Sequence, residues 1–313
     1  MKRFLLRVLL PTIAIIITVL ASAELYLRSL PNDFKYRANY MNEHVSEIKV
    51  LVIGASCTAM GVKPSYFDWQ PSFSLAYANQ PILYSYLILN NYIDRMDSLR
   101  CVVMDATYGG LWDKGQNAKS FLKRYSIYYG LNDFKGFENN YEISANIKDI
   151  YKRLIHESDR AAFTTCDLDG FQSRYFVNIP YDDEKWKTHG QKFSVEHTLF
   201  NTTIDNDDAQ KVCGDNYVLL NQIVSLCEKR KVKVLFVSTP CHPYYYNGYN
   251  PIQKGIVDST FAALCREFNN VKWFDYTESE YFNNEDFSNS NHLNTNGAIK
   301  LTKMLNDSIE KWN

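Results

Sequence analysis

Short β-rich runs alternate with helical patterns along this chain, and this alternation constrains its fold more than any other feature. The last third of the chain shows it most clearly, with β-rich runs at 232–238 and 271–275 between helical patterns at 217–230, 252–268 and 295–312. Strands joined by helices of this length form parallel βαβ units with right-handed crossovers. The sequence therefore predicts an α/β fold in which helices cover both faces of a mostly parallel sheet.

Three further runs predict the first part of the sheet. They are residues 48–54, 72–78 and 100–105. A long apolar helix is expected between the second and third of them, at 82–96. From 111 to about 215 the patterns are weaker, with one helix expected at 143–155 and a short strand at 175–177. We interpret this segment as an insertion that carries substrate-facing loops rather than as an independent domain.

The N-terminal segment is the second strong pattern. Positive charges at Lys2, Arg3 and Arg7 precede an almost wholly apolar run to Leu27, long enough to span a bilayer core of about 30 Å. The positive-inside rule keeps this end in the cytoplasm and predicts that the rest of the chain is exported. Cleavage after Ala23 by a signal peptidase is the alternative, which would give a secreted protein. We favour a single-pass membrane anchor, and expect an anchor at 1–28, a polar spacer at 29–47 and one domain at 48–313.

Charge and cysteine usage argue against several classes of protein. The net charge of −1 gives no basis for binding nucleic acid or an anionic membrane surface. Seven cysteines leave at least one unpaired, and Cys101 and Cys227 lie in an apolar strand and an amphipathic helix, which argues against a disulfide framework. No CxxC pair occurs and the six histidines are widely spread, so no metal site is expected.

Two short motifs carry side chains suited to acyl chemistry. Gly54-Ala55-Ser56 ends the first strand, and His292 lies in a run of small polar residues just before the last helix. Both positions are strand-to-helix connections, and in open α/β sheets ligands bind at the carboxyl edge of the strands. We therefore predict that Ser56 and His292 meet at this edge, with the hydroxyl as nucleophile and the imidazole as base.

These motifs resemble the SGNH/GDSL-type hydrolases. The resemblance rests on the strand before Gly54-Ala55-Ser56-Cys57-Thr58, on Gly61-Val62-Lys63-Pro64, and on Asn291-His292-Leu293-Asn294 followed by Gly297-Ala298. It is closer to the membrane-anchored branch associated with acylation or deacylation of bacterial surface polysaccharides. The resemblance implies a three-layer α/β/α sandwich of flavodoxin-like type with five parallel strands. It also implies ester hydrolysis or acyl transfer through a serine acyl-enzyme.

The chain departs from this family at the acid and at the oxyanion hole. The family acid, three residues before the histidine, falls on Asn289, whose carbonyl can still accept the Nδ1–H of the imidazole. Asp286 is the alternative acid if its loop folds back. The Gly and Asn that usually complete the oxyanion hole are not plainly present, which leaves Asn79, or Gln80 beside it, as the candidate donor. A role for Asn79 as a helix cap is equally open.

Other polar side chains follow strands at the same edge. Asp105 and Asp275 each end a strand, and we expect them to cap helices or turns. Cys57 is expected to be packed, because neighbouring residues in an extended turn point in different directions. His242 is a candidate substrate contact, with Tyr244-Tyr245-Tyr246 available to stack on a sugar, although ordinary loop packing is the alternative.

These expectations describe an exported serine esterase or O-acyltransferase for acetyl-type groups on a cell-surface glycan. No cofactor is expected. An acyltransferase needs an activated donor, which according to the resemblance a multi-span membrane acyltransferase would supply. The second hypothesis is a catalytically impaired protein that binds a glycan or a partner protein. Asn289 at the position of the acid favours this hypothesis.

Overall fold

The computed structural model describes residues 2–114, 119–131, 140–144, 164–173, 180–199 and 206–312. The strand expected at 175–177 and most of the helix expected at 143–155 lie outside these residues. The chain divides into two compact units, one formed by residues 1–39 with 119–164 and the other by residues 40–118 with 165–313. We describe each unit by itself.

A five-stranded sheet forms the centre of the second unit. Its strands are β1 (Val50–Ile53), β2 (Ser72–Ser74), β3 (Cys101–Asp105), β4 (Lys233–Ser238) and β5 (Val271–Asp275). They lie in the order β2-β1-β3-β4-β5, and all neighbours are parallel. This is the flavodoxin-like order, in which the chain changes direction across the sheet between β1 and β3 and ligands bind beyond the carboxyl ends there.

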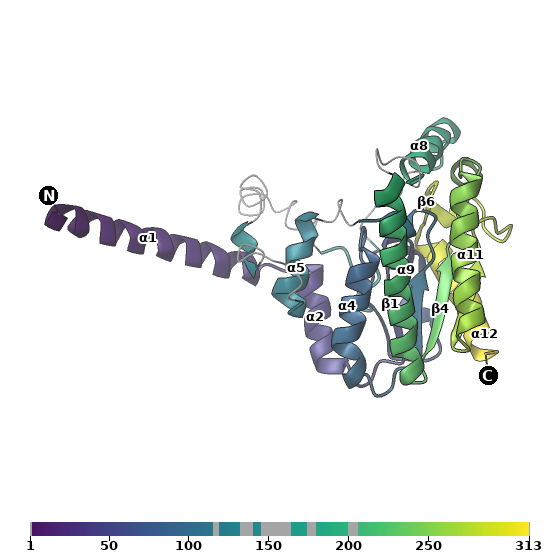
Figure 1. Cartoon of the computed structure of the whole chain (residues 1–313), viewed down its shortest axis with the longest axis horizontal. Coiled ribbons are helices and arrows are strands. Elements are labelled where there is room, and N and C mark those ends of the chain that lie inside the picture. Colours follow the sequence, from purple (N-terminus) through teal and green to yellow (C-terminus); the bar gives the residue numbers. More distant parts are fainter. Residues whose placement is uncertain are drawn as a thin grey trace. The chain divides into compact units, whose positions relative to one another are not determined.

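Helices cover both faces of the sheet, because successive residues of a strand point to opposite faces. On one face, side chains such as Val52, Val103 and Leu235 share a buried core with α3 (Ser56–Gly61) and α12 (Thr295–Glu310). The other face is covered by α4 (Ile82–Tyr92), α9 (Asn206–Lys229) and α11 (Pro251–Glu267), which Figure 1 shows beside one another. There the ring of Phe236 in β4 packs 4.9 Å from that of Phe261 in α11. The predicted three-layer α/β/α sandwich is confirmed.

Smaller elements connect and cover these layers. They are η1 (Pro64–Tyr66), η2 (Ile93–Arg95), η3 (Gly110–Trp112), α8 (Asp183–Glu196), α10 (Pro243–Tyr246) and η7 (Asn284–Asp286). A separate antiparallel pair, β6 (Phe287–Asn289) and β7 (His292–Leu293), precedes α12. The sequence predicted a loop around His292, whereas the structure places this residue in the short strand β7.

The first unit contains α1 (Lys2–Ser29), α5 (Lys119–Tyr129), η6 (Glu142–Ser144) and the beginning of α2 (Asp33–His44). α1 carries an apolar stretch, Arg7–Ser29, with a mean hydropathy of 2.2, which is long enough to cross a membrane or to act as a signal sequence. The polar spacer expected at 29–47 is instead largely helical. The reason is an apolar face on α2, where the ring of Phe34 packs edge-on against that of Tyr125 at 5.0 Å.

Candidate active site

Ser56 follows β1 through a turn that only glycine can make. Gly54 adopts a φ of +120°, and a Cβ at this position would overlap the carboxylate of Asp105 at the end of β3. Oδ1 of Asp105 accepts hydrogen bonds from the backbone N–H of Ala55 (2.8 Å) and from the hydroxyl of Thr58 (3.3 Å). Burial raises the pKa of Asp105, while these hydrogen bonds act in the opposite direction. Asp105 therefore ties the turn before Ser56 to the neighbouring strand, in keeping with the turn role expected for it.

The structure brings Ser56 and His292 together. Nε2 of His292 lies 2.9 Å from Oγ of Ser56, and its Nδ1 lies 3.2 Å from Oδ1 of Asn289. The backbone N–H of Asn291 donates to the same Oδ1 at 3.0 Å, which identifies that atom as the amide oxygen. An amide oxygen only accepts, so Nδ1 of His292 carries the proton and Nε2 is left to accept the hydroxyl proton of Ser56.

His292 is held as a neutral imidazole. Burial lowers its pKa to about 3, and repulsion from His197 and His189 acts in the same direction. Asp286 does not supply the missing carboxylate, because its Oδ2 accepts from Lys300 Nζ (2.9 Å) and from the backbone N–H of Asn283 (3.0 Å). The hydroxyl and imidazole therefore stand as a pair oriented by an amide.

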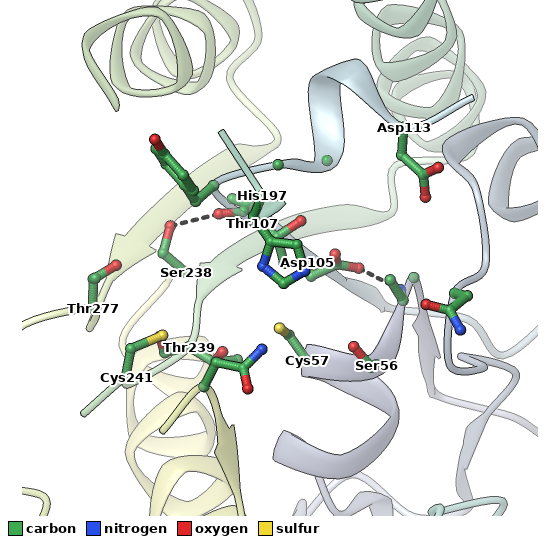
Figure 2. A pocket seen from close by; sticks show the side chains of 18 of the residues that line it. Ser56, Cys57, Asp105, Thr107, Asp113, His197, Ser238, Thr239, Cys241 and Thr277 are labelled. Atoms are coloured by element: carbon green, nitrogen blue, oxygen red, sulfur yellow. Dashed lines mark hydrogen bonds between the residues drawn. The ribbon is translucent and has the colours of Figure 1, made fainter. Parts of the chain in front are cut away.

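A pocket of about 180 Å³ opens beside Ser56 at the carboxyl edge of the sheet. Residues that follow each of the five strands line it, and Figure 2 shows Ser56 and Cys57 on one side of this space. Asn79 lines the pocket with an exposed side chain and a positive φ of 58°. Gln80 also lines it, but its amide nitrogen donates to Ser85 Oγ at 2.9 Å. Of the two predicted donors, Asn79 is thus the better placed to meet a ligand.

His242 is held by hydrogen bonds within the protein. Its Nδ1 accepts from the backbone N–H of Tyr244 at 3.3 Å, and its Nε2 lies 3.0 Å from Oδ1 of Asn284. The side chain is buried and does not line the pocket beside Ser56. Of the three tyrosines after it, Tyr245 lines the pocket, whereas Tyr244 donates to Asp183. The structure therefore gives no support to a substrate contact at His242.

Cys57 and Cys241 line the pocket as protonated thiols. Burial raises the pKa of Cys57 to about 12, with the nearby carboxylate of Asp105 acting in the same direction, and burial also raises the pKa of Cys241. A thiol is a strong nucleophile only as the thiolate, so neither competes with Ser56 near neutral pH. All seven cysteines fall among the described residues, and none of them forms a disulfide.

His197 is a pocket residue that the sequence did not reveal. It follows α8, inside the insertion expected at 111–215, and its Nδ1 lies 2.6 Å from the hydroxyl of Tyr245. The contact joins positions 48 residues apart, and no local pattern marks either of them. Within the described part of the chain, no group of His, Cys, Asp or Glu side chains is arranged to hold a metal ion.

Comparison with known proteins adds distant structural neighbours. An inferred acylhydrolase from Bacteroides fragilis is 12% identical, with a TM-score of 0.40 over 88% of this chain and 97% of the other. A GDSL-like lipase from Bacteroides thetaiotaomicron is also 12% identical, with a TM-score of 0.42 over 89% and 98%. Similarity at this level carries no argument about activity. The curated proteins gave no match.

One protein-family model matches residues 125–312. The match covers more than half of the chain and includes α8, β4, β5 and the hairpin that carries His292. The chain therefore belongs to the family that this model defines.

Proposed function

We propose that the protein is a serine esterase or O-acyltransferase of the SGNH type that acts on ester-linked acyl groups through Ser56 and His292. The observation that carries this proposal is the 2.9 Å contact from Ser56 Oγ to His292 Nε2, in the only tautomer that can accept the hydroxyl proton. His292 would take the proton as Oγ attacks the acyl carbon, and would return it to the leaving oxygen.

The N-terminal helix and the lining of the pocket support a substrate at the cell surface. The charges at Lys2, Arg3 and Arg7 before the apolar part of α1 favour a cytoplasmic N-terminus. The part of the chain that follows α1 would then be exported. The pocket beside Ser56 is small, with hydroxyl, amide and tyrosine side chains in its wall, which suits an acetyl-type group on a sugar. In a transfer reaction, a multi-span membrane acyltransferase would supply the activated donor.

Covalent labelling tests the proposal directly. The full chain in detergent is treated with a fluorophosphonate probe, and the labelled peptide is identified by mass spectrometry. We expect labelling at Ser56, and release of acetate from 4-nitrophenyl acetate and from an O-acetylated polysaccharide. Both should be lost in Ser56→Ala, while Ser65→Ala, a serine outside the pocket, serves as the matched control. A wild-type protein that folds but shows neither labelling nor hydrolysis would refute the proposal.

Asn289 supports one second candidate, a protein that binds an acylated glycan without turnover. An amide cannot stabilise the imidazolium as a carboxylate does. Under this alternative, an O-acetylated oligosaccharide binds the wild-type protein and the Ser56→Ala variant equally in calorimetry, and neither releases acetate.

A further inference from the structure

We propose that His197 is a third catalytic side chain of this pocket, which donates a hydrogen bond from Nε2–H to the acyl oxygen of the substrate. We further propose that Tyr245 is a positioning residue that fixes the tautomer required for this role. The inference rests on the proposed function and adds a residue to it. It also adds a second candidate side-chain donor, besides Asn79, to the wall of this pocket.

The main chain around His197 is fixed at the pocket wall by a buried glutamine. Nε2 of Gln253 in α11 donates to the carbonyl oxygens of His197 (2.7 Å) and Tyr108 (2.9 Å), and its Oε1 accepts the N–H of Leu199 at 2.8 Å. Gln253 is 0% exposed, so these bonds are not in competition with water. Preorganisation of this kind is what a hydrogen-bond donor needs in order to act on a transition state.

In this proposal, the hydroxyl of Tyr245 determines which nitrogen of His197 carries the proton. Tyr245 is 5% exposed, and a buried hydroxyl must donate its proton to an acceptor. The neighbouring hydroxyl of Tyr249 donates to Cys241 Sγ at 3.7 Å, and Nδ1 of His197 lies 2.6 Å from Tyr245 Oη. We assign Tyr245 as the donor in this contact, so that Nδ1 of His197 accepts. Burial lowers the pKa of His197, so the ring is neutral and its proton is on Nε2.

The remaining nitrogen faces the pocket. The structure gives Nε2 of His197 no hydrogen-bond partner among the described residues, and His197 lines the same pocket as Ser56. Figure 2 shows its imidazole across this space from Ser56 and Cys57. With this assignment, the two histidines are held in opposite tautomers. His292 presents a lone pair at Nε2 and acts as a base, while His197 presents an N–H and acts as a donor.

Transfer of the acyl group to Ser56 is balanced without proton transfer from His197. The bond from Ser56 Oγ to the acyl carbon forms as the hydroxyl proton moves to Nε2 of His292. The π electrons of the carbonyl move to its oxygen, which accepts hydrogen bonds from His197 Nε2–H and from the backbone N–H of Ser56. When the carbonyl re-forms, the bond to the leaving oxygen breaks, and that oxygen takes the proton from His292.

Substitution of His197 tests the donor role in the full chain in detergent, with 4-nitrophenyl acetate as substrate. His197→Ala should lower kcat by about 100-fold, as loss of one oxyanion donor does, with KM changed less than about threefold. His197→Gln places an amide N–H at a similar reach and should keep kcat within about tenfold of wild type. His44→Gln, at a half-exposed histidine outside the pocket, is the matched control.

Substitution of Tyr245 tests the tautomer. Tyr245→Phe should lower kcat by about tenfold in the wild-type background, because the proton of His197 can then move to Nδ1. In the His197→Gln background the same change should have a much smaller effect, since an amide has no tautomer to select. Circular dichroism and thermal unfolding of each variant show whether it remains folded.

The outcomes separate this inference from the proposed function. An active wild type whose kcat is unchanged in His197→Ala overturns the inference and leaves Ser56 and His292 in place. Equal losses in His197→Ala and His197→Gln, with lower thermal stability in both, show a packing role and also overturn it. A wild type without hydrolysis or labelling of Ser56 refutes the proposed function, and the donor role with it.

Discussion

Asn289 is the residue that decides how well His292 can act as a base. The imidazole must become positively charged as the hydroxyl of Ser56 reacts, yet burial and two neighbouring histidines hold its pKa at about 3. An amide orients the ring through its 3.2 Å contact but adds no negative charge. In the proposed reaction, the geometry of the pair is therefore suited to acyl transfer, while its electrostatics would limit the rate.

A carboxylate at this position should increase the rate. Asn289→Asp retains an acceptor for Nδ1–H and for the backbone N–H of Asn291, and it raises the pKa of His292. We expect kcat on 4-nitrophenyl acetate to rise by about 10- to 100-fold, a fraction of the roughly 10⁴-fold effect of this carboxylate in a serine protease. Asn289→Ala should lower it. A folded Asn289→Asp protein with unchanged kcat would contradict the role assigned to this position.

Substitution of Gly54 should affect both the stability of the fold and the reactivity of Ser56. A side chain there meets the Asp105 carboxylate and a backbone φ of +120°, so Gly54→Ala should destabilise the fold by about 2 to 4 kcal/mol and abolish labelling of Ser56. Gly255→Ala in α11 is the matched control, because a Cβ there meets open space and alanine favours a helix. Urea unfolding and fluorophosphonate labelling measure the two effects, and equal behaviour of both variants would contradict the account of the turn.

At the scale of elements, α1 is fixed to its own unit by its last turns. Glu24 is 9% exposed, and its carboxylate accepts the backbone N–H groups of Glu142 (3.1 Å) and Ile143 (2.8 Å) and also contacts Arg28. Leu27, one turn further on, is completely buried. The apolar part of α1 therefore continues without interruption into a folded part of the chain.

This continuity predicts that α1 is not removed by signal peptidase in the cell. The bond between Ala23 and Glu24 lies inside the helix, next to the buried carboxylate, whereas proteolysis favours exposed and poorly ordered segments. We expect intact mass spectrometry of the membrane-extracted protein to show the uncleaved N-terminus. We also expect Glu24→Ala to lower the thermal midpoint, while Glu43→Ala, an exposed position in α2, leaves it unchanged. A mature protein that begins at Glu24 would contradict the prediction of an anchor.

The elements that the sequence predicted well are those with purely local signals. The apolar run of β5 was predicted with its observed bounds, Val271–Asp275, and α12 ends two residues before its predicted end. By contrast, the polar composition of α2 hid the apolar face that includes Phe34. The proximity of Ser56 and His292 followed from fold topology, whereas the contact of His197 with Tyr245 depends on packing between α8 and α10, which no periodicity encodes.

At the scale of the whole molecule, the buried histidines link stability to pH. Burial lowers the pKa of His189, His197, His242 and His292 below the usual value of 6.5. In the unfolded chain these groups take up protons as the pH falls below about 6.5, while in the folded protein they do so only at lower pH. The unfolded state then binds more protons, so the free energy of unfolding decreases as the pH falls.

The largest share of this effect should come from His292. With a folded pKa of about 3, it favours unfolding by about 2 kcal/mol at pH 5 relative to pH 7. We expect the urea midpoint of the full chain in detergent to fall between pH 7 and pH 5, and the fall to be smaller in His292→Gln, which cannot take up a proton. His44→Gln, at a half-exposed histidine, is the matched control. An equal decrease in all three proteins would show that His292 does not carry this acid sensitivity, and would remove the evidence that it is neutral and desolvated beside Ser56.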